Sequence, residues 1–304
     1  AIQFIDGFTK PSKEVINSMR SMGNEAIKAG KQIQSAGKTI TSVGSTLTKA
    51  ITVPIAGVAT AAVKTAADFE AAMSEVGAIS GASAQDLATL TAKAKEMGAT
   101  TSFSASESAE AMKYMAMAGW KTADMTAGIA GIMNLAAAAG EDLGTTSDIV
   151  TDGLTAFGMS AKESGRFADV MAATSTNANT NVTMLGESFK YCAATAGAMG
   201  YNIEDISVAL GVMANAGIKG STAGTTLKNV IANMAKPTDA QAAVMQKLGI
   251  SLTDSSGNMK SFAEVMNNLR SSFNGLSETE KASYATTLAG KESMSGLLTI
   301  VNAS

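Results

Sequence analysis

The sequence contains no histidine, a single cysteine and three prolines among its 304 residues. Without histidine, the chain cannot form a Ser-His-Asp or Cys-His active site, nor the common zinc and haem sites that need imidazole. One cysteine excludes a disulfide, a CxxC site and a cysteine-held iron–sulfur cluster within the chain. Together with the motifs tested below, these absences lead us to expect no cofactor, no metal site and no enzymatic activity.

Aromatic and charged residues are also scarce, at 5% and 16% of the chain, and the formal net charge is −3. A protein of this charge is not, as a whole, a polycation built to bind DNA. Alanine and methionine are abundant instead, with 56 and 19 copies. Both favour helices, and no long Val/Ile/Tyr alternation is present, so the composition predicts an all-α fold. Two interpretations stay open: an ordinary alanine-rich helical protein, or one whose surface is partly covered by copies of itself or by a partner.

Charge divides the chain into two parts. Residues 1–64 carry 8 basic and 3 acidic groups, whereas residues 65–304 carry 15 basic and 23 acidic groups. This asymmetry predicts two modules. We expect a basic N-terminal helical segment over residues 1–67 and a compact multi-helix domain over residues 68–304.

The N-terminal segment has a heptad pattern, with apolar residues spaced alternately by four and three. The seam consists of Val15, Met19, Met22, Ala26, Ala29, Ile33, Ala36, Ile40, Val43, Leu47 and Ala50. Such a seam predicts a helix that packs against another helix as a coiled coil. Beside it, Gly23, Gly30, Gly37 and Gly44 recur every seven residues. Because each glycine weakens a helix by about 0.5–1 kcal/mol, we interpret the four as sites of close helix–helix approach, with chance placement or a frayed helix as the alternative.

The stretch at residues 50–63 (AITVPIAGVATAAV) carries no charge. A membrane-spanning helix needs about 20 apolar residues, and Pro54 interrupts this shorter run. A buried helix or hinge is the favoured interpretation, and a membrane-inserting peptide is the alternative.

Beyond Asp68 the pattern changes to short helices with clear start and stop signals. Four Ser-x-x-Glu capping boxes mark starts, at Ser104/Glu107, Ser160/Glu163, Ser261/Glu264 and Ser277/Glu280. Glycines that follow the last turn of a helix mark ends, at Gly98, Gly119, Gly140, Gly200, Gly217, Gly249 and Gly290. These signals predict helices near residues 55–80, 84–97, 105–118, 123–139, 142–157, 161–175, 183–199, 203–216, 221–235, 238–248, 262–274, 278–289 and 291–302. Residues 250–262 (ISLTDSSGNMKSF) predict one short β-hairpin that turns at residues 254–257.

Residues capable of chemistry are few. The carboxylate pairs Glu141-Asp142 and Glu204-Asp205 fall in predicted first turns, where acidic groups stabilise a helix. Glu187 is the best candidate for a glycan-cleaving acid, but the sequence motif expected downstream of it is missing. Cys192 lies in an apolar predicted helix, so we expect its small side chain to be buried. We expect Met112, Met115 and Met117 to pack in the core, where the flexible methionine side chain adapts to irregular spaces.

From about residue 69 to the end, the sequence resembles the core region of phage tail tape measure proteins, which belong to the phage minor tail protein family. Long segments carry the resemblance, among them FEAAMSEVGAISGAS (69–83), GATTSFSASESAEAMKYMAMAGW (98–120) and GESFKYCAATAGAMGYNIEDISVALGVMANAGIKGSTAGTTL (186–227). They keep their order over about three-quarters of the chain. The resemblance implies a structural component of a phage or phage-like tail and contributes no catalytic residue.

The resemblance also implies partners and a location. A tape measure protein lies in the lumen of the tail tube or at the tail tip, is made in the host cytoplasm, and acts in tail-length determination, tail assembly and genome delivery. Its expected partners are further copies of itself, tail tube and tail tip proteins, tail assembly chaperones and, during ejection, the host membrane and phage DNA. The competing functional hypothesis is a membrane-active segment that inserts and oligomerises in the host envelope during ejection.

Overall fold

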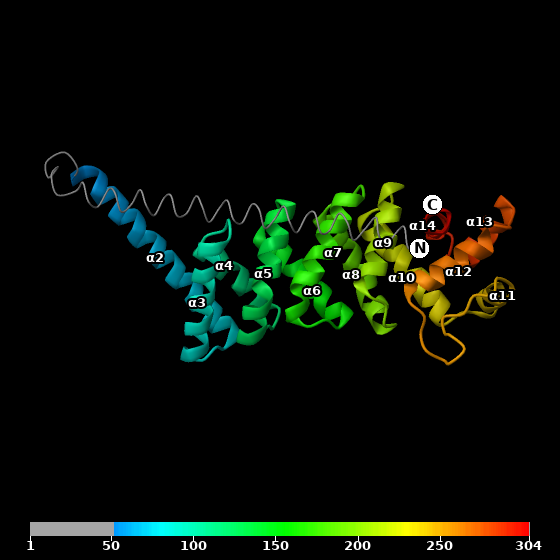
Figure 1. Cartoon of the computed structure of the whole chain (residues 1–304), viewed down its shortest axis with the longest axis horizontal. Helices are drawn as coiled ribbons and strands as arrows, with labels where there is room; N and C mark the ends of the chain where they lie inside the picture. The colour runs from blue at the N-terminus through cyan, green and yellow to red at the C-terminus, as the bar shows by residue number, and fades with distance from the viewer. Residues whose placement is uncertain (1–51, 304) are drawn as a thin grey trace. The chain divides into compact units, whose positions relative to one another are not determined.

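The computed structural model describes residues 52–303, with side chains from residue 65 onward (Figure 1). Over this range the chain forms α-helices, one 3₁₀ turn and no β-strand, so the all-α prediction is confirmed. The helices are α2 (Thr52–Ser80), α3 (Ala84–Thr100), α4 (Ala105–Met117), α5 (Thr122–Ala139), α6 (Leu143–Phe157), α7 (Ser164–Asn177), α8 (Val182–Ala198), α9 (Ile203–Asn215), α10 (Gly220–Ala235), α11 (Asp239–Lys247), α12 (Phe262–Phe273), α13 (Glu278–Ala289) and α14 (Met294–Asn302), and the 3₁₀ turn is η1 (Ala161–Glu163).

The predicted capping boxes set the starts of these helices. In α4, the backbone N–H of Ser104 donates to Glu107 Oε2 at 2.7 Å while the Ser104 hydroxyl accepts from Glu107 N at 3.2 Å. The boxes at Ser261 and Ser277 repeat this reciprocal pattern at α12 and α13. At Ser160 the box begins η1, so the α-helix itself starts at Ser164, three residues later than predicted.

Glycine ends most helices as predicted, with one correction. A positive φ occurs at Gly119, Gly140, Gly200, Gly217, Gly249 and Gly290. Gly98 instead lies inside α3, which continues to Thr100. A Cβ at Gly98 would come within 2.4 Å of Ala105 N, so this position requires glycine because the start of α4 passes against it.

The predicted β-hairpin near residues 250–262 is not formed as a strand pair. A single antiparallel bridge joins Thr253 and Met259. The turn that it encloses does occur, with Gly257 at φ 85°. Asp254 holds this turn, because its Oδ1 accepts the N–H groups of Ser256 and Asn258 at 2.8 and 2.9 Å. These side-chain bonds add to two backbone bonds across the turn, from Asp254 N to Asn258 O at 2.9 Å and from Lys260 N to Leu252 O at 2.8 Å.

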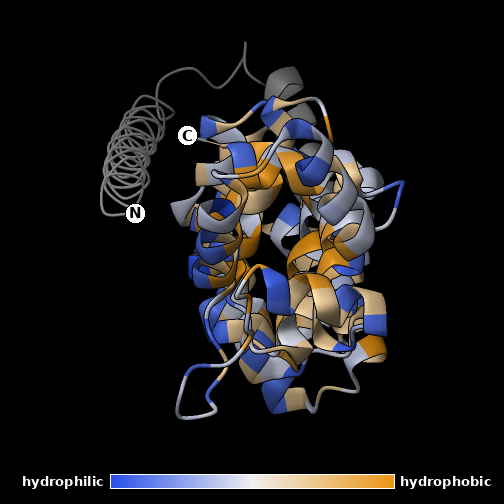
Figure 2. Cartoon of the chain, turned by 90° about the vertical axis from the view of Figure 1, so that its right-hand side faces the viewer, coloured by the Kyte–Doolittle hydropathy of each residue, from blue (hydrophilic) through white to orange (hydrophobic). Residues whose placement is uncertain are grey.

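The chain divides into two compact units between residues 148 and 149. The predicted boundary at 67/68 falls inside the continuous helix α2, and most of the proposed N-terminal segment lies outside the described residues. The division into an N-terminal segment and a helical domain therefore stays a prediction. Figure 2 shows hydrophobic segments on the inward sides of the helices and hydrophilic ones along the outer edges.

The unit of residues 149–304 depends on close approach between thin helices. A Cβ at Gly197 on α8 would lie 2.3 Å from the carbonyl oxygen of Ala156 on α6. On another side of α8, a Cβ at Gly224 of α10 would lie 2.2 Å from Ser188 O. Backbone lies against backbone at both contacts, and the rings of Phe167, Phe262 and Phe273 are fully buried in the same unit.

Candidate functional site

The residues predicted to pack helices in the N-terminal segment lie outside the described residues. They are Val15, Met19, Gly23, Gly30, Ile33, Gly37, Ile40, Val43, Gly44 and Leu47. Their role stays a prediction, and the candidate sites below come from residues 65–303.

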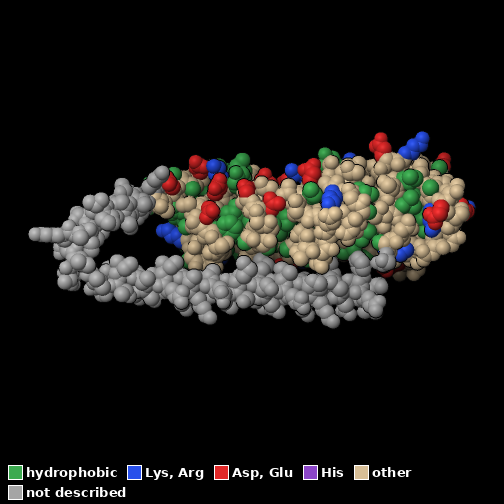
Figure 3. All heavy atoms as spheres, turned by 90° about the horizontal axis from the view of Figure 1, so that it is seen from above, with side chains coloured by type: hydrophobic (Ala, Val, Ile, Leu, Met, Phe, Trp, Pro, Cys, Tyr) green, Lys and Arg blue, Asp and Glu red, His purple; other side chains and the backbone are tan. Residues whose placement is uncertain are grey.

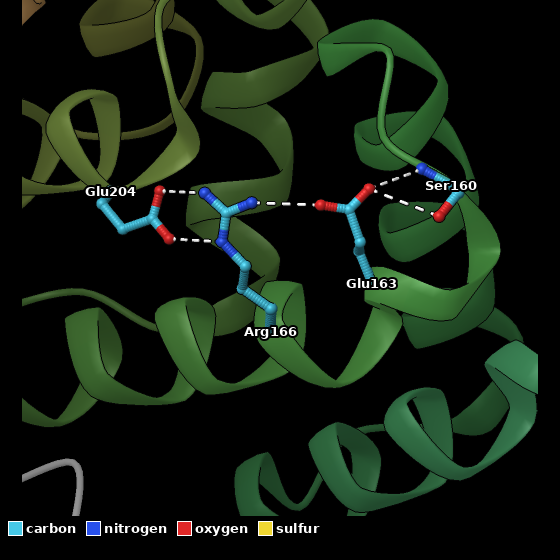
Figure 4. Close-up of polar contacts among 4 residues, drawn as sticks. All are labelled: Ser160, Glu163, Arg166 and Glu204. Carbon is cyan, nitrogen blue, oxygen red and sulfur yellow. Dashed lines mark hydrogen bonds and ion pairs between the residues drawn. The ribbon is translucent and has the colours of Figure 1, made fainter.

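The most organised group of charges surrounds Arg166, near the start of α7 (Figure 4). Its Nε and Nη2 donate to the two carboxylate oxygens of Glu204 at 2.7 and 2.8 Å. Its Nη1 donates to Glu163 Oε1 at 3.1 Å. The planar guanidinium thereby joins the N-terminal turns of α7 and α9, and a forked donor is the group that can bind one carboxylate through two parallel bonds. The hydrogen bonds to Glu204 raise the pKa of Arg166.

The second carboxylate of this group is held from both sides. Glu163 Oε2 accepts the backbone N–H of Ser160 at 2.9 Å, and this bond lowers the pKa of Glu163. Glu163 therefore completes a capping box and an ion pair at once. Both carboxylates are engaged with donors, which is the arrangement of a structural clamp and not of a general acid paired with a general base.

The neighbouring carboxylate of Asp205 also joins two helices. Its Oδ2 accepts the backbone N–H of Ala263, in the first turn of α12, at 3.0 Å. Burial raises the pKa of Asp205, while the bond from Ala263 opposes that shift. The Glu204-Asp205 pair lies in the first turn of α9, as predicted, and each member contacts a different helix.

The other acidic pair is placed one residue differently from the prediction. Helix α6 begins at Leu143, so Glu141 and Asp142 precede it. Asp142 Oδ1 accepts the backbone N–H of Thr145 at 2.7 Å, as an N-cap residue does. Its position therefore has a structural explanation.

Glu187, the candidate glycan-cleaving acid, lies on α8 with its side chain 43% exposed, and Lys190 Nζ is 3.8 Å from its carboxylate. A catalytic acid of this kind needs an apolar pocket that keeps it protonated, and a second carboxylate on the other side of the scissile bond. Glu187 is half-exposed and lies beside a lysine, so it is not in such a pocket. Within the described range, no group of three acidic or cysteine residues could hold a metal ion.

The sulfur-containing residues belong mostly to the core. Cys192 is fully buried, and burial raises the pKa of its thiol to about 12, so the thiol is inert at neutral pH. Met112 and Met115 are fully buried, which confirms core packing for them, but Met117 is 63% exposed, and the prediction was wrong there.

Sequence reasoning missed the Arg166–Glu204 clamp, because its partners lie 38 positions apart in the chain. One signal was present: arginine occurs only three times, at Arg20, Arg166 and Arg270, against 20 lysines. A rare arginine in a lysine-using sequence points to a position that needs the forked geometry.

No helix in the described part of the chain is long and apolar enough to cross a membrane. The part of the uncharged run that the structure covers, residues 52–63, forms the start of α2.

Comparison with known proteins agrees with the resemblance. The residue pattern of the family described as phage-related minor tail protein matches residues 91–290. The tape measure protein of Pneumococcus phage Dp-1 is 38% identical over 254 residues, which cover 84% of this chain and 22% of that relative. The probable tape measure protein of Escherichia phage P2 is 26% identical over 265 residues, covering 83% of this chain and 32% of the relative. No solved structure matches.

This chain thus spans between a fifth and a third of the length of these two relatives. The matched region includes all of α4–α13, among them the helices that are joined by the clamp and by the contacts of Gly197 and Gly224. On this match, the chain belongs to the phage-related minor tail protein family.

Proposed function

We propose that this chain is a folded structural segment of a phage tail tape measure protein, acting in tail assembly, tail-length determination and genome delivery. The observation that carries the proposal is the 38% identity to a tape measure protein over 84% of the chain. The most organised carboxylates, Glu163 and Glu204, are engaged in a capping box and in the Arg166 clamp, which supports a role without catalysis.

The helix lengths support different roles for the heptad segment and for the short helices that follow it. A ruler gains length in proportion to residue number only where it is one continuous helix, at about 1.5 Å per residue. The longest described helix is α2, with 29 residues, and α11 and α14 have nine each. Residues 52–303 therefore act as a folded assembly element made of short helices, and the heptad segment before them is the ruler-like part of this chain.

The proposed location is the lumen of the tail tube or the tail tip. The proposed partners are further copies of the chain, tail tube and tip proteins, and assembly chaperones, with the host membrane and phage DNA as contacts during ejection. Residues 1–64 have a net charge of +5, most of it from lysines. This positive charge would attract an acidic protein surface, anionic lipid or DNA.

The test is an in-frame deletion of residues 52–303 in the parent phage or phage-like particle, with a wild-type copy supplied in trans as the control. Electron microscopy of the lysate should show no complete tails, and the wild-type copy should restore them. Tails of normal length and number would refute the structural role. Complete tails shortened by about 1.5 Å for each residue removed would show that this region is itself the ruler.

A further inference from the structure

Four turns between helices share one sequence pattern. Each has a glycine with positive φ, then an apolar or aromatic residue, then the N-cap of the next helix, and an acidic residue three positions after the cap. The four occurrences are residues 81–86 (GASAQD), 119–124 (GWKTAD), 158–163 (GMSAKE) and 200–205 (GYNIED). They begin 38, 39 and 42 positions apart, which is within the usual length of a helical repeat.

The backbone closes these four turns in the same way. The residue after each glycine donates its N–H to the carbonyl five positions earlier, a bond that ends a helix and needs a left-handed residue before the donor. The bonds run from Ala82 to Gly77 O at 3.3 Å, from Trp120 to Met115 O at 3.0 Å, from Met159 to Leu154 O at 2.8 Å and from Tyr201 to Ala196 O at 3.0 Å. The shared pattern is therefore one structural unit that occurs four times.

In the first unit, helices two places apart repeat at the same interval. Lys113 Nζ on α4 lies 2.7 Å from the carboxylate of Glu75 on α2, 38 positions earlier. Lys121 Nζ, just beyond α4, donates to Ser80 O at 3.4 Å across 41 positions. Position numbers increase together in the two pairs, so α2 and α4 run parallel at an offset close to the spacing of the turns.

The second unit has the same relation between α7 and α9. Arg166, near the start of α7, pairs with Glu204 in the first turn of α9, 38 positions later. Beyond the other end of α7, the Asn179 N–H donates to Asn215 Oδ1 at 2.7 Å across 36 positions. These helices also run parallel, so α9 repeats the position of α7 one turn pattern later.

Each helical hairpin packs on the helices beside it in the chain. In the first unit, α2 and α3 both contact α4, and α3 contacts α5. In the second unit, α7 contacts α8 and α9, and α8 contacts α9 and α10. Figure 3 shows small, separate hydrophobic patches on the face that it draws, as expected when apolar residues are buried between neighbouring helices.

The C-terminal helices are connected differently. Helix α9 also contacts α12 and α14, and α10 contacts α13 and α14. The hairpin α8–α9 is therefore held by helices from farther along the chain. The hairpin α2–α3, in contrast, has one neighbouring hairpin within the described residues, α4–α5.

We propose that residues 52–215 consist of four copies of one helical hairpin, α2–α3, α4–α5, α6–α7 and α8–α9, and that the first three open one at a time, beginning with α2–α3. The stability of a repeat array is the sum of the stabilities of its repeats and of the interfaces between neighbours, so an end repeat can open while the rest stays folded. This inference concerns how the chain unfolds and does not depend on its role in a tail.

The test is stretching of the complete 304-residue chain in optical tweezers, with one handle at each terminus. One hairpin of 38–42 residues releases about 125–150 Å of chain, at about 3.3–3.6 Å per residue. We expect three successive steps of this size, followed by a larger step when α8–α9 opens together with the C-terminal helices. A single step, or two steps that match residues 52–148 and 149–303, would overturn the proposal.

Two matched substitutions test the order of opening. Gly81→Val and Gly119→Val change the same position of the first and second turns, where φ is 65° and 86° and a Cβ meets nothing within 4 Å. Each therefore adds only backbone strain. Strain of about 1.4 kcal/mol corresponds to about tenfold faster hydrogen exchange of the amides that the opening exposes.

Hydrogen exchange measured by mass spectrometry should respond unequally to the two substitutions. Gly81→Val should accelerate exchange in both α3 and α5, because α2–α3 is already open when α4–α5 opens. Gly119→Val should accelerate exchange in α5 and leave α3 unchanged, because α2–α3 opens first. Circular dichroism checks that both variants keep their helices. Equal acceleration of α3 by the two substitutions would mean that the first unit opens as a whole, and would refute opening by single hairpins.

Discussion

Gly197 is the residue at which the identity of one side chain most clearly decides the packing. Its missing Cβ leaves room for the carbonyl oxygen of Ala156 in the last turn of α6, and a Cβ there would also lie 3.0 Å from the Cα of Phe157, so the backbone itself would have to move. Glycine at this position lowers the helix propensity of α8 but allows the two helices to pack closely.

Replacing Gly197 with alanine should therefore destabilise the chain. The gain in helix propensity is about 1 kcal/mol at most, and forcing the helices apart costs about 1–3 kcal/mol. Urea denaturation should show a net loss of up to about 2 kcal/mol in the free energy of unfolding. The control is Gly165→Ala on α7, where a Cβ meets nothing within 4 Å, and this variant should be neutral or slightly more stable. Equal effects of the two substitutions would contradict the close-approach argument.

Glu280 makes a titratable contribution to stability. The Ser277 hydroxyl donates to its carboxylate at 2.7 Å, and this bond, with that from the Ser277 backbone, lowers its pKa below the ordinary 4.5. A lowered carboxyl pKa stabilises the fold above the unfolded-state pKa, and that stabilisation is lost as the pH falls through the folded-state pKa. The window of loss therefore opens near pH 4.5 and extends to lower pH.

We expect Glu280→Gln to flatten the decline of stability below pH 4.5 while keeping most of the stability at pH 7, because glutamine can also complete a capping box. The comparison variant Ser277→Ala should lose about 1 kcal/mol at pH 7. Denaturation curves from pH 7 to 3 measure both effects. An unchanged slope in Glu280→Gln would show that the carboxylate is not coupled to folding.

At the scale of the elements, the helices could be predicted from the sequence far better than their contacts. Ser104/Glu107 and Gly140 act within about one turn of the chain, so local chemistry defines them whatever lies nearby. Gly98 was misassigned because its reason is the passage of Ala105, a contact between helices that no local pattern encodes. The Arg166–Glu204 clamp was missed for the same reason. The hairpin was overestimated because backbone pairing stops after the single bridge between Thr253 and Met259, while the Asp254 side chain holds the turn that this bridge encloses.

Contact between α6 and α7 provides a test at this scale. A Cβ at Gly153 would lie 2.3 Å from the ring of Phe167, which is fully buried. Gly153→Ala should lower the free energy of unfolding by about 1–3 kcal/mol. Phe167→Leu alone should also destabilise the chain, because it leaves a cavity. The double variant should be more stable than the sum of the two losses predicts, since the smaller side chain leaves space for the methyl group. Strict additivity in the double-mutant cycle would refute direct packing.

The clamp should contribute little despite its geometry. The side chains of Arg166 and Glu204 are 48% and 35% exposed, and exposed ion pairs are worth about 0–1 kcal/mol. Arg166→Lys keeps the charge but loses the forked pairing, so we expect thermal unfolding to show a loss below about 1 kcal/mol. A loss of several kcal/mol would mean that the clamp holds α7 and α9 together by itself.

At the scale of the whole molecule, charge distinguishes three parts of the chain. Residues 1–64 are basic and heptad-patterned, residues 65–148 are acidic, and residues 149–304 are nearly neutral. The difference in charge between residues 1–64 and the rest of the chain, together with the end of the heptad pattern, predicted two modules. The division between residues 148 and 149 was not predicted, because it falls within the continuous helix α6, at a point where no glycine, proline or loop-like stretch marks a boundary. In the proposed function, the heptad segment measures and the folded units assemble.

The most direct test is tail length in particles whose parent chain lacks residues 23–43, three heptads of the seam. A ruler loses about 1.5 Å for each residue removed, so tails measured by electron microscopy should be shorter by about 30 Å with a narrow length distribution. The matched control, Gly197→Leu in the folded unit, should reduce the number of tails and leave their length unchanged. Tails of unchanged length after the deletion, or tails shortened by Gly197→Leu, would contradict the account.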